Sequence, residues 1–186
     1  MIPVTTTGID YDVTFDYSNA KYTFTVATFP IVDIIGNGTT GTEAGWATGI
    51  DLSTTDGETY IIKNLKLYAT SSDSDPVGAA AGVKFRLNNS WDTNWGGTAF
   101  PVGPTAGNND NIMVDAGTYN VTFNRLTGAY AFSFPIVDII GNGLTGNESG
   151  WSAGIDMATT DGVNYTITRT LFATSSDSDP VNGAAG

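Results

Sequence analysis

One stretch of the sequence occurs twice. Phe29–Gly57 reads FPIVDIIGNGTTGTEAGWATGIDLSTTDG, and Phe134–Gly162 reads FPIVDIIGNGLTGNESGWSAGIDMATTDG. Seven of these 29 positions differ, and the similarity continues into the segment ATSSDSDPV, which is found at 69–77 and again at 173–181. Internal similarity at a fixed spacing is typical of repeated structural units. The sequence therefore predicts a repeating unit of about 105 residues.

A second similarity sets the boundaries of this unit. The segment YDVTF at 11–15 resembles YNVTF at 119–123, and both lead through Tyr-x-Phe into Phe-Pro-Ile-Val. We therefore expect a complete unit at 29–133, the C-terminal hairpin of a preceding unit at 1–28, and the N-terminal half of a following unit at 134–186. The hairpin and the half unit together lack a counterpart of KFRLNNSWDTNWGG, so we interpret the chain as part of a longer tandem array.

The pattern of apolar residues predicts an all-β fold. Residues 11–17 and 22–26 alternate between apolar and polar side chains, as half-buried strands do, and a short turn between them predicts a hairpin. The Asp-Gly pairs at 56–57 and 161–162 predict tight turns. A unit of this length with several short strands fits an immunoglobulin-like or carbohydrate-binding-module-like β-sandwich.

The junction between units contains no flexible linker. The last strand of the complete unit, 130–134, continues through Pro135 into the next predicted strand, 136–140. Flexible tethers are rich in Gly and Ser, and none is present here. The sequence thus predicts a stiff string of β-domains.

Composition excludes several classes of function. The chain has 186 residues, a formal net charge of -12, no His and no Cys. It therefore cannot contain a Ser-His-Asp triad, a catalytic thiol, a disulfide or a Cys/His zinc site. The acidic balance argues against binding to nucleic acid, and no apolar run approaches the ~18 residues of a membrane span. We expect a protein that is not an enzyme, and its Thr, Asn and Gly content favours an extracellular or cell-surface location.

Gly36–Gly41 matches the dinucleotide-binding pattern G-x-G-x-x-G. That pattern binds pyrophosphate only where the glycines open a helix. The residues that follow contain too many Gly and Thr for a helix, so we interpret the motif as a β-turn.

Acidic residues recur at matching positions in both copies, most clearly in the SSDSDP segments at 71–76 and 175–180. Alternate aspartates in a loop can supply the oxygen ligands that calcium prefers. The calcium candidates are Asp33, Asp73, Asp75, Asp138, Asp177 and Asp179. The alternative is that these are solvated acids that cap turns and keep the protein soluble. The sequence requires no other cofactor.

The most distinctive segments are KFRLNNSWDTNWGG at 84–97 and AGTYNVTF at 116–123. Together with Gly45-Trp46, in this order and spacing, they resemble the tandem modules of the SusE/SusF outer-membrane starch-binding lipoproteins. The resemblance covers the whole central unit. It implies a β-sandwich in an extracellular bacterial setting, and it implies glycan binding.

A glycan site needs aromatic faces for the sugar rings and planar polar groups for the hydroxyls. The candidates are Trp46, Lys84, Arg86, Trp91, Asn94 and Trp95. The alternative is that one or two of the Trp side chains lie in the core and that Arg86 pairs with Asp92.

Two functions follow from these observations. The first is a structural extracellular fibre or surface stalk of head-to-tail β-domains, whose partners are neighbouring copies of the same unit. The second is a surface array that binds a polysaccharide. Near-identity of the copies and the missing linker favour the first, because a polymer needs the same interface at every step.

Overall fold

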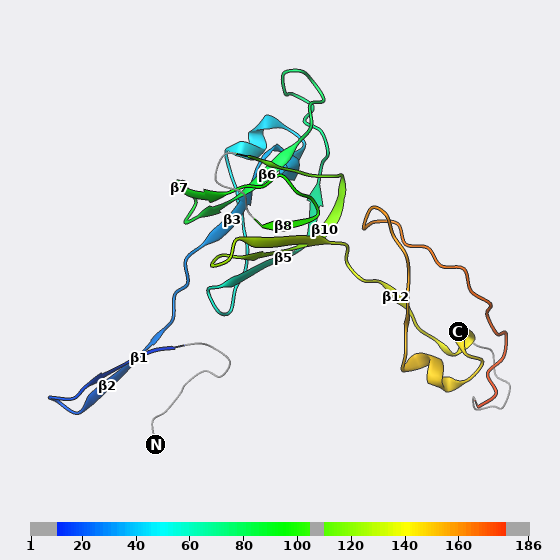
Figure 1. Cartoon of the computed structure of the whole chain (residues 1–186). Helices are drawn as coiled ribbons and strands as arrows, with labels where there is room; N and C mark the ends of the chain where they lie inside the picture. Colours follow the sequence, from blue (N-terminus) through cyan, green and yellow to red (C-terminus); the bar gives the residue numbers. More distant parts are fainter. Residues whose placement is uncertain (1–10, 105–109, 178–186) are drawn as a thin grey trace. The chain divides into compact units, whose positions relative to one another are not determined.

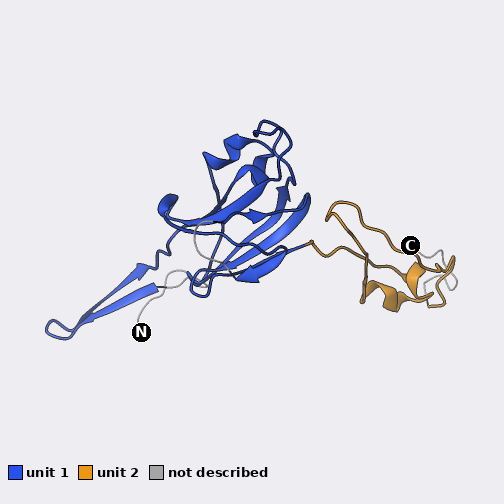
Figure 2. Ribbon diagram, turned by 45° about the horizontal axis from the view of Figure 1, so that its top comes forward, with its two compact units in different colours: residues 1–133 blue, residues 134–186 orange. Residues whose placement is uncertain are grey.

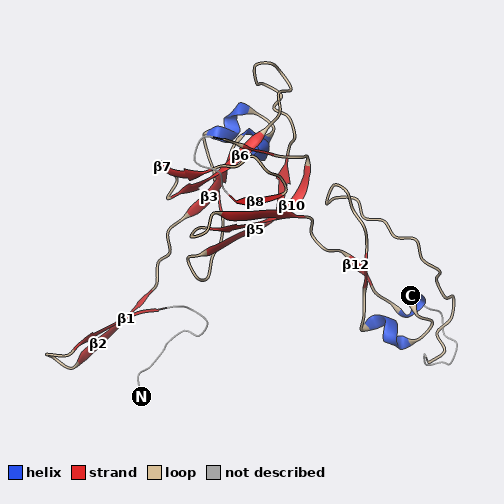
Figure 3. Cartoon of the chain, in the orientation of Figure 1, coloured by secondary structure: helices blue, strands red, loops and turns tan. Residues whose placement is uncertain are grey.

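In a computed structural model, the described residues are 11–104 and 110–177, and they form an all-β protein (Figure 3). The chain divides into two compact units, Met1–Ser133 and Phe134–Gly186 (Figure 2). Within the described ranges, no helix is long and apolar enough to cross a membrane.

Residues 29–133 contain two antiparallel sheets, and we call them the two-sheet domain (Figure 1). The first sheet has the strand order β5 (Thr59–Leu67), β10 (Gly117–Asn124), β11 (Ala129–Ser133) and β8 (Val102–Pro104). The second has the order β4 (Ile50–Asp51), β3 (Val32–Ile35), β6 (Gly82–Leu87) and β7 (Ser90–Trp95), with β9 (Ile112–Met113) also paired to β6.

The core lies between these two sheets. The ring of Phe85 on β6 stacks on Phe123 of β10, with centroids 4.3 Å apart. Trp95 of β7 packs against the same Phe123 at 5.1 Å. Burial of aromatic rings of this size is the main source of stability in such a core. The packing of the two sheets agrees with the predicted β-sandwich class.

The segment with the G-x-G-x-x-G pattern folds as one turn of helix, α1 (Asn37–Thr40), followed by the 3-10 turn η1 (Glu43–Trp46). The sequence predicted a β-turn here. Gly36 has φ +145°, and a side chain at this position would collide with the backbone of Gly82 on β6. The Asn37 Oδ1 atom accepts a hydrogen bond from the Gly82 N–H at 2.8 Å. The motif thus packs this loop closely against β6.

The predicted N-terminal hairpin is confirmed as β1 (Tyr11–Asp16) and β2 (Lys21–Val26). Its turn is held by Asp16 Oδ1, which accepts hydrogen bonds from the N–H groups of Ser18 at 2.9 Å and Asn19 at 3.2 Å. Hydrogen bonds from the side chains of Ser18 and then Asn19 lower the pKa of Asp16 to about 2.

The second copy of the duplicated sequence repeats the local structure of the first. It contains β12 (Asp138–Ile139), η2 (Asn142–Leu144), η3 (Glu148–Trp151) and β13 (Ile155–Asp156). Asn142 Nδ2 donates to Glu148 Oε1 at 2.7 Å, as Asn37 does to Glu43 at 2.7 Å. The counterpart of β5 differs: residues 164–171 form no strand, and Thr166 makes only an isolated bridge with Ala158.

Candidate functional site

A row of polar residues crosses the second sheet on the face away from the core. Strand pairing places Asp51, Asp33, Arg86 and Asn94 side by side on β4, β3, β6 and β7. Side chains on neighbouring strands in register share one face of a sheet. The adjacent row, which includes Ile34 and Phe85, faces the core.

Asp33 and Arg86 form a buried ion pair at the centre of this row. Arg86 Nη2 lies 2.5 Å from Asp33 Oδ2, and Arg86 Nε donates to both carboxylate oxygens at 3.2 Å. The side chains are only 7% and 0% exposed. A buried pair of this kind is retained because each charge requires the other, even where the pair adds little net stability.

Two tryptophans border the ion pair. The guanidinium carbon of Arg86 lies 4.8 Å from the ring centroid of Trp91, within range of a cation–π interaction. The ring of Trp46 lies 6.2 Å from that of Trp91, at an interplanar angle of 38°. Asn88 and Asn89 have φ of 52° and 55°, and this left-handed pair forms the tight β6–β7 turn that returns the chain to Trp91.

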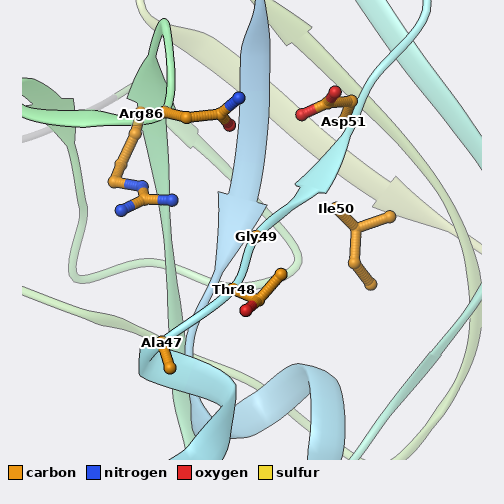
Figure 4. Close-up of a pocket in the computed structure, with 7 residues that line it drawn as sticks. Ala47, Thr48, Gly49, Ile50, Asp51 and Arg86 are labelled. Carbon is orange, nitrogen blue, oxygen red and sulfur yellow. The ribbon is translucent and has the colours of Figure 1, made fainter.

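A pocket of about 580 Å³ lies next to Arg86. It is lined by residues 47–51, which lead into and include β4, together with Arg86 and Asn89 (Figure 4). When the Asn89 amide is oriented with its nitrogen toward the two carboxylates, this nitrogen donates to Asp51 Oδ1 at 3.2 Å and to Asp33 Oδ2 at 3.1 Å. Gly49 lets the loop pass over the ion pair, because a side chain there would overlap Asp33 Oδ2. The pocket therefore presents a guanidinium, a carboxylate and an amide, which suits a ligand rich in hydroxyl groups.

The remaining glycan candidates divide between the two faces. Lys84 Nζ donates to Asn94 Oδ1 at 3.0 Å, and Asn94 Nδ2 donates to the Trp91 carbonyl oxygen at 3.0 Å. Burial lowers the pKa of Lys84, while the charge of Asp110 acts in the opposite direction. Trp95 lies with the core, against Phe123. The structure therefore brings together Trp46, Arg86 and Trp91, places Lys84 and Asn94 beside them, and directs Trp95 elsewhere.

The calcium candidates are spread over several elements. The carboxylate of Asp33 forms the ion pair with Arg86. Asp73 Oδ1 accepts from the Glu43 N–H at 2.7 Å, and Asp177 Oδ1 accepts from the Glu148 N–H at 2.6 Å. Asp75 and Asp138 are exposed, and Asp179 lies outside the described residues. Across residues 11–104 and 110–177, no three acidic side chains gather in a group that could hold a metal ion.

Sequence reasoning missed the contacts that organise this site. Asp33 was a calcium candidate, and Asp92 was the alternative partner of Arg86, whereas Asp92 instead accepts a hydrogen bond from Ser90 Oγ at 2.8 Å. A signal was present, because Asp33 and Arg86 are both embedded in apolar strand sequences. A charge buried on one strand needs an opposite charge on a neighbour.

Asp51 and Asn89 carried no such signal. Asp51 lies on the two-residue strand β4 and Asn89 lies in the β6–β7 turn, and their approach to the ion pair depends on the tertiary fold. Comparison of the chain with protein-family models, with curated proteins and with solved structures finds no match.

Proposed function

We propose that the protein is a structural component of an extracellular fibre or surface stalk, in which β-domains follow one another head to tail without flexible linkers. The observation that supports this proposal is the way in which the chain enters and leaves the two-sheet domain. The segment that enters the domain is held to it by packing and hydrogen bonds. The strand that leaves the domain, β11, runs away from the point of entry.

The entering segment is held by three consecutive residues. The ring of Phe29 lies against Gly57, so closely that no side chain would fit there. The Pro30 carbonyl accepts a hydrogen bond from the Tyr60 hydroxyl at 2.6 Å, and the Ile31 N–H donates to Asn88 Oδ1 at 3.0 Å. Only residues 27 and 28 separate β2 from this segment, and two residues span at most about 7 Å.

The leaving strand extends away from this point. Gly57 lies at the end of β10 that contains Asn124, because the Arg125 side chain donates to the Gly57 carbonyl at 3.0 Å. β11 begins at this end of β10 and runs antiparallel to it, until Ser133 pairs with Asn120. In the second copy, the Pro135 carbonyl accepts from the Tyr165 hydroxyl at 2.6 Å, as Pro30 does from Tyr60. This arrangement supports a stiff, extended connection of successive domains.

Stiffness of the first junction is measured directly by pulsed electron paramagnetic resonance. Because the chain has no Cys, spin labels at Lys21→Cys on β2 and Leu126→Cys beyond β10 are unique. We expect one narrow distance distribution. A matched variant with a six-residue Gly-Ser insertion between Ala27 and Thr28 should broaden it. A broad distribution in the parent would contradict a stiff junction.

Electron microscopy tests the fibre itself. We expect the assembled protein to form filaments with a regular axial spacing of domains. Isolated particles in native material would contradict the fibre.

A second candidate function is glycan binding at the pocket beside Arg86. The specific observation in its favour is the pair of Trp46 and Trp91 beside the pocket of about 580 Å³. Trp91 contacts Arg86, which lines the pocket, and Trp46 directly precedes the lining residue Ala47. Exposed aromatic rings beside planar hydrogen-bonding groups are the features that sugar recognition requires. This role is compatible with a fibre whose domains also bind polysaccharide.

Affinity electrophoresis in gels that contain starch or other glycans tests this role. If the pocket binds glycan, the parent protein is retarded, and Trp91→Ala weakens binding by about tenfold or more, equivalent to ~1.4 kcal/mol. The matched control is Trp151→Ala, because Trp151 is the counterpart of Trp46 in the second copy of the sequence. The control should be retarded like the parent. Absence of retardation of the parent on every glycan would reject this function.

A further inference from the structure

The basic group of the pocket is already paired within the protein. Two of the three guanidinium nitrogens of Arg86, Nε and Nη2, donate to the carboxylate of Asp33. One face of the guanidinium lies over the ring of Trp91, 4.8 Å from its centroid. Arginine recognises the carboxylate of a ligand through two donors at once, and Arg86 already uses two of its donors on Asp33. The charge of Arg86 is therefore compensated before a ligand binds.

The carboxylate of Asp51, by contrast, has no cation beside it. Asp51 lines the pocket and is exposed (Figure 4). Within the described parts of the chain, no Lys or Arg forms an ion pair with Asp51. Lys84, the other basic residue of β6, donates to Asn94 and does not line the pocket. Asp33, Arg86 and Asp51 together thus leave one negative charge uncompensated at the pocket.

The amide of Asn89 adds a further acceptor to the pocket. Its nitrogen faces the carboxylates of Asp51 and Asp33, at 3.2 Å and 3.1 Å. The oxygen and the nitrogen of an amide point in different directions from one carbon atom, so the Asn89 oxygen is directed away from both carboxylates. An amide oxygen and a carboxylate only accept hydrogen bonds. The polar groups left for a ligand are therefore mostly acceptors, and the ligand must supply the donors.

The charge of the two-sheet domain acts in the same direction. Residues 29–133 contain ten acidic and five basic side chains. A surplus of one sign attracts ligands of the opposite charge and repels ligands of the same charge. Among glycans, those with carboxylates are therefore disfavoured at this pocket, and those with ammonium groups are favoured.

We propose that the pocket beside Arg86 binds glycans that carry free amino groups, and that Asp51 is the residue that selects them. This proposal rests on the glycan role of the same pocket. An ammonium group brings three N–H donors and a positive charge, so it bonds to the acceptors of Asp51 and Asn89 and compensates the charge of Asp51. A hydroxyl at the same position brings one donor and no charge. A carboxylate there adds a second negative charge beside Asp51.

Three tetrasaccharides with the same β-1,4 linkage isolate the charge of the ligand. They consist of glucosamine, glucose and glucuronate units, and they carry positive, no and negative charge. Isothermal titration calorimetry at pH 6, where the amines are protonated, measures their affinities for the parent protein. We expect the glucosamine tetramer to bind at least tenfold more tightly than the glucose tetramer, and the glucuronate tetramer to bind most weakly.

Two variants separate the charge of Asp51 from the overall charge of the domain. Asp51→Asn keeps the shape of the side chain and removes its charge, so the preference for glucosamine over glucose should fall below threefold. The glucose tetramer should bind this variant as it binds the parent. The matched control is Asp92→Asn, which removes the same charge from β7 at a residue that does not line the pocket. This control should keep the preference of the parent.

The remaining outcomes overturn the proposal. Equal affinities of the parent for the glucosamine and glucose tetramers, or a preference that survives in Asp51→Asn, would show that Asp51 does not select amino groups. Either result leaves the glycan role of the pocket in place. Failure of all three tetrasaccharides to bind would also overturn the selection of amino glycans. The glycan role itself is rejected only if affinity electrophoresis shows no retardation of the parent on any glycan.

Discussion

At the scale of single residues, the ion pair between Asp33 and Arg86 organises the outer face of the second sheet. Both groups are buried, and Arg86 also contacts the ring of Trp91. Removal of one partner leaves an uncompensated charge, which costs far more than the pair contributes. The pair therefore fixes the positions of β3 and β6 relative to one another.

We expect Arg86→Met to lower the free energy of unfolding by about 3–5 kcal/mol, because Asp33 is left without its partner. The double variant Asp33→Leu, Arg86→Met should recover most of this loss. Asp92→Asn is the control and should change stability by less than about 0.5 kcal/mol, because Asp92 is exposed. Urea unfolding followed by Trp fluorescence measures all three. Equal midpoints for the parent and Arg86→Met would contradict a stabilising role for the pairing.

At the scale of elements, the Asp-Gly turns are built around a carboxylate. Asp56 Oδ1 accepts from the N–H groups of Glu58 and Thr59, both at 2.8 Å, and Asp161 Oδ1 makes the same bonds to Val163 and Asn164. The backbone hydrogen bond from Glu58, followed by that from Thr59, lowers the pKa of Asp56. The backbone hydrogen bond from Asn164 is the largest contribution that lowers the pKa of Asp161.

We expect Asp56→Asn to lower Tm at neutral pH and to have little effect in acid. The folded pKa of Asp56 lies below the unfolded value of about 3.9, so its charge stabilises the fold above that pH. This stabilisation is lost as the pH falls through the folded pKa. Thermal unfolding of parent and variant between pH 7 and pH 2 checks this, and Asp161→Asn should behave in the same direction. A Tm difference that stays constant at low pH would show that the charge is not responsible.

The elements also show what the sequence can and cannot predict. The β1–β2 hairpin and the turns at Asp56 and Asp161 depend on neighbours in the chain, and alternation and turn residues predicted them. The helical turn α1 was missed because it depends on the close approach of Gly36 to Gly82, 46 positions away. The partner of Arg86 was missed for the same reason, since strand order decides which charge lies opposite.

At the scale of the whole molecule, the two-sheet domain is the best-buried part of the chain. Its apolar core contrasts with the exposed apolar residues of the hairpin and of residues 134–177. The sequence predicted the all-β class from strand patterns. It could not predict which of the similar segments are buried, because burial depends on whether the neighbouring strands are present.

We expect limited proteolysis at low protein concentration to cleave residues 134–177 and the hairpin first and to leave a fragment near 29–133. Segments with few buried apolar contacts open more often and are cleaved from the open state. Mass spectrometry of a thermolysin time course identifies the fragments. Equal survival of 134–177 and the two-sheet domain at low concentration would contradict this difference in local stability.

The hydrogen bonds that hold the entering segment, residues 29–31, also determine how the protein responds to mechanical load. Tension along a chain of such domains would pull on Pro30 and Ile31 at one side and on Ser133 at the other. The force would then act at the same time on three sets of hydrogen bonds. These are the bond from the Tyr60 hydroxyl to Pro30, the bonds between Ile31 and Asn88, and the β3–β6 ladder. Because rupture under force is governed by the rate of unfolding, this shared loading slows extension of the domain. A filament built in this way would resist shear at the surface that carries it.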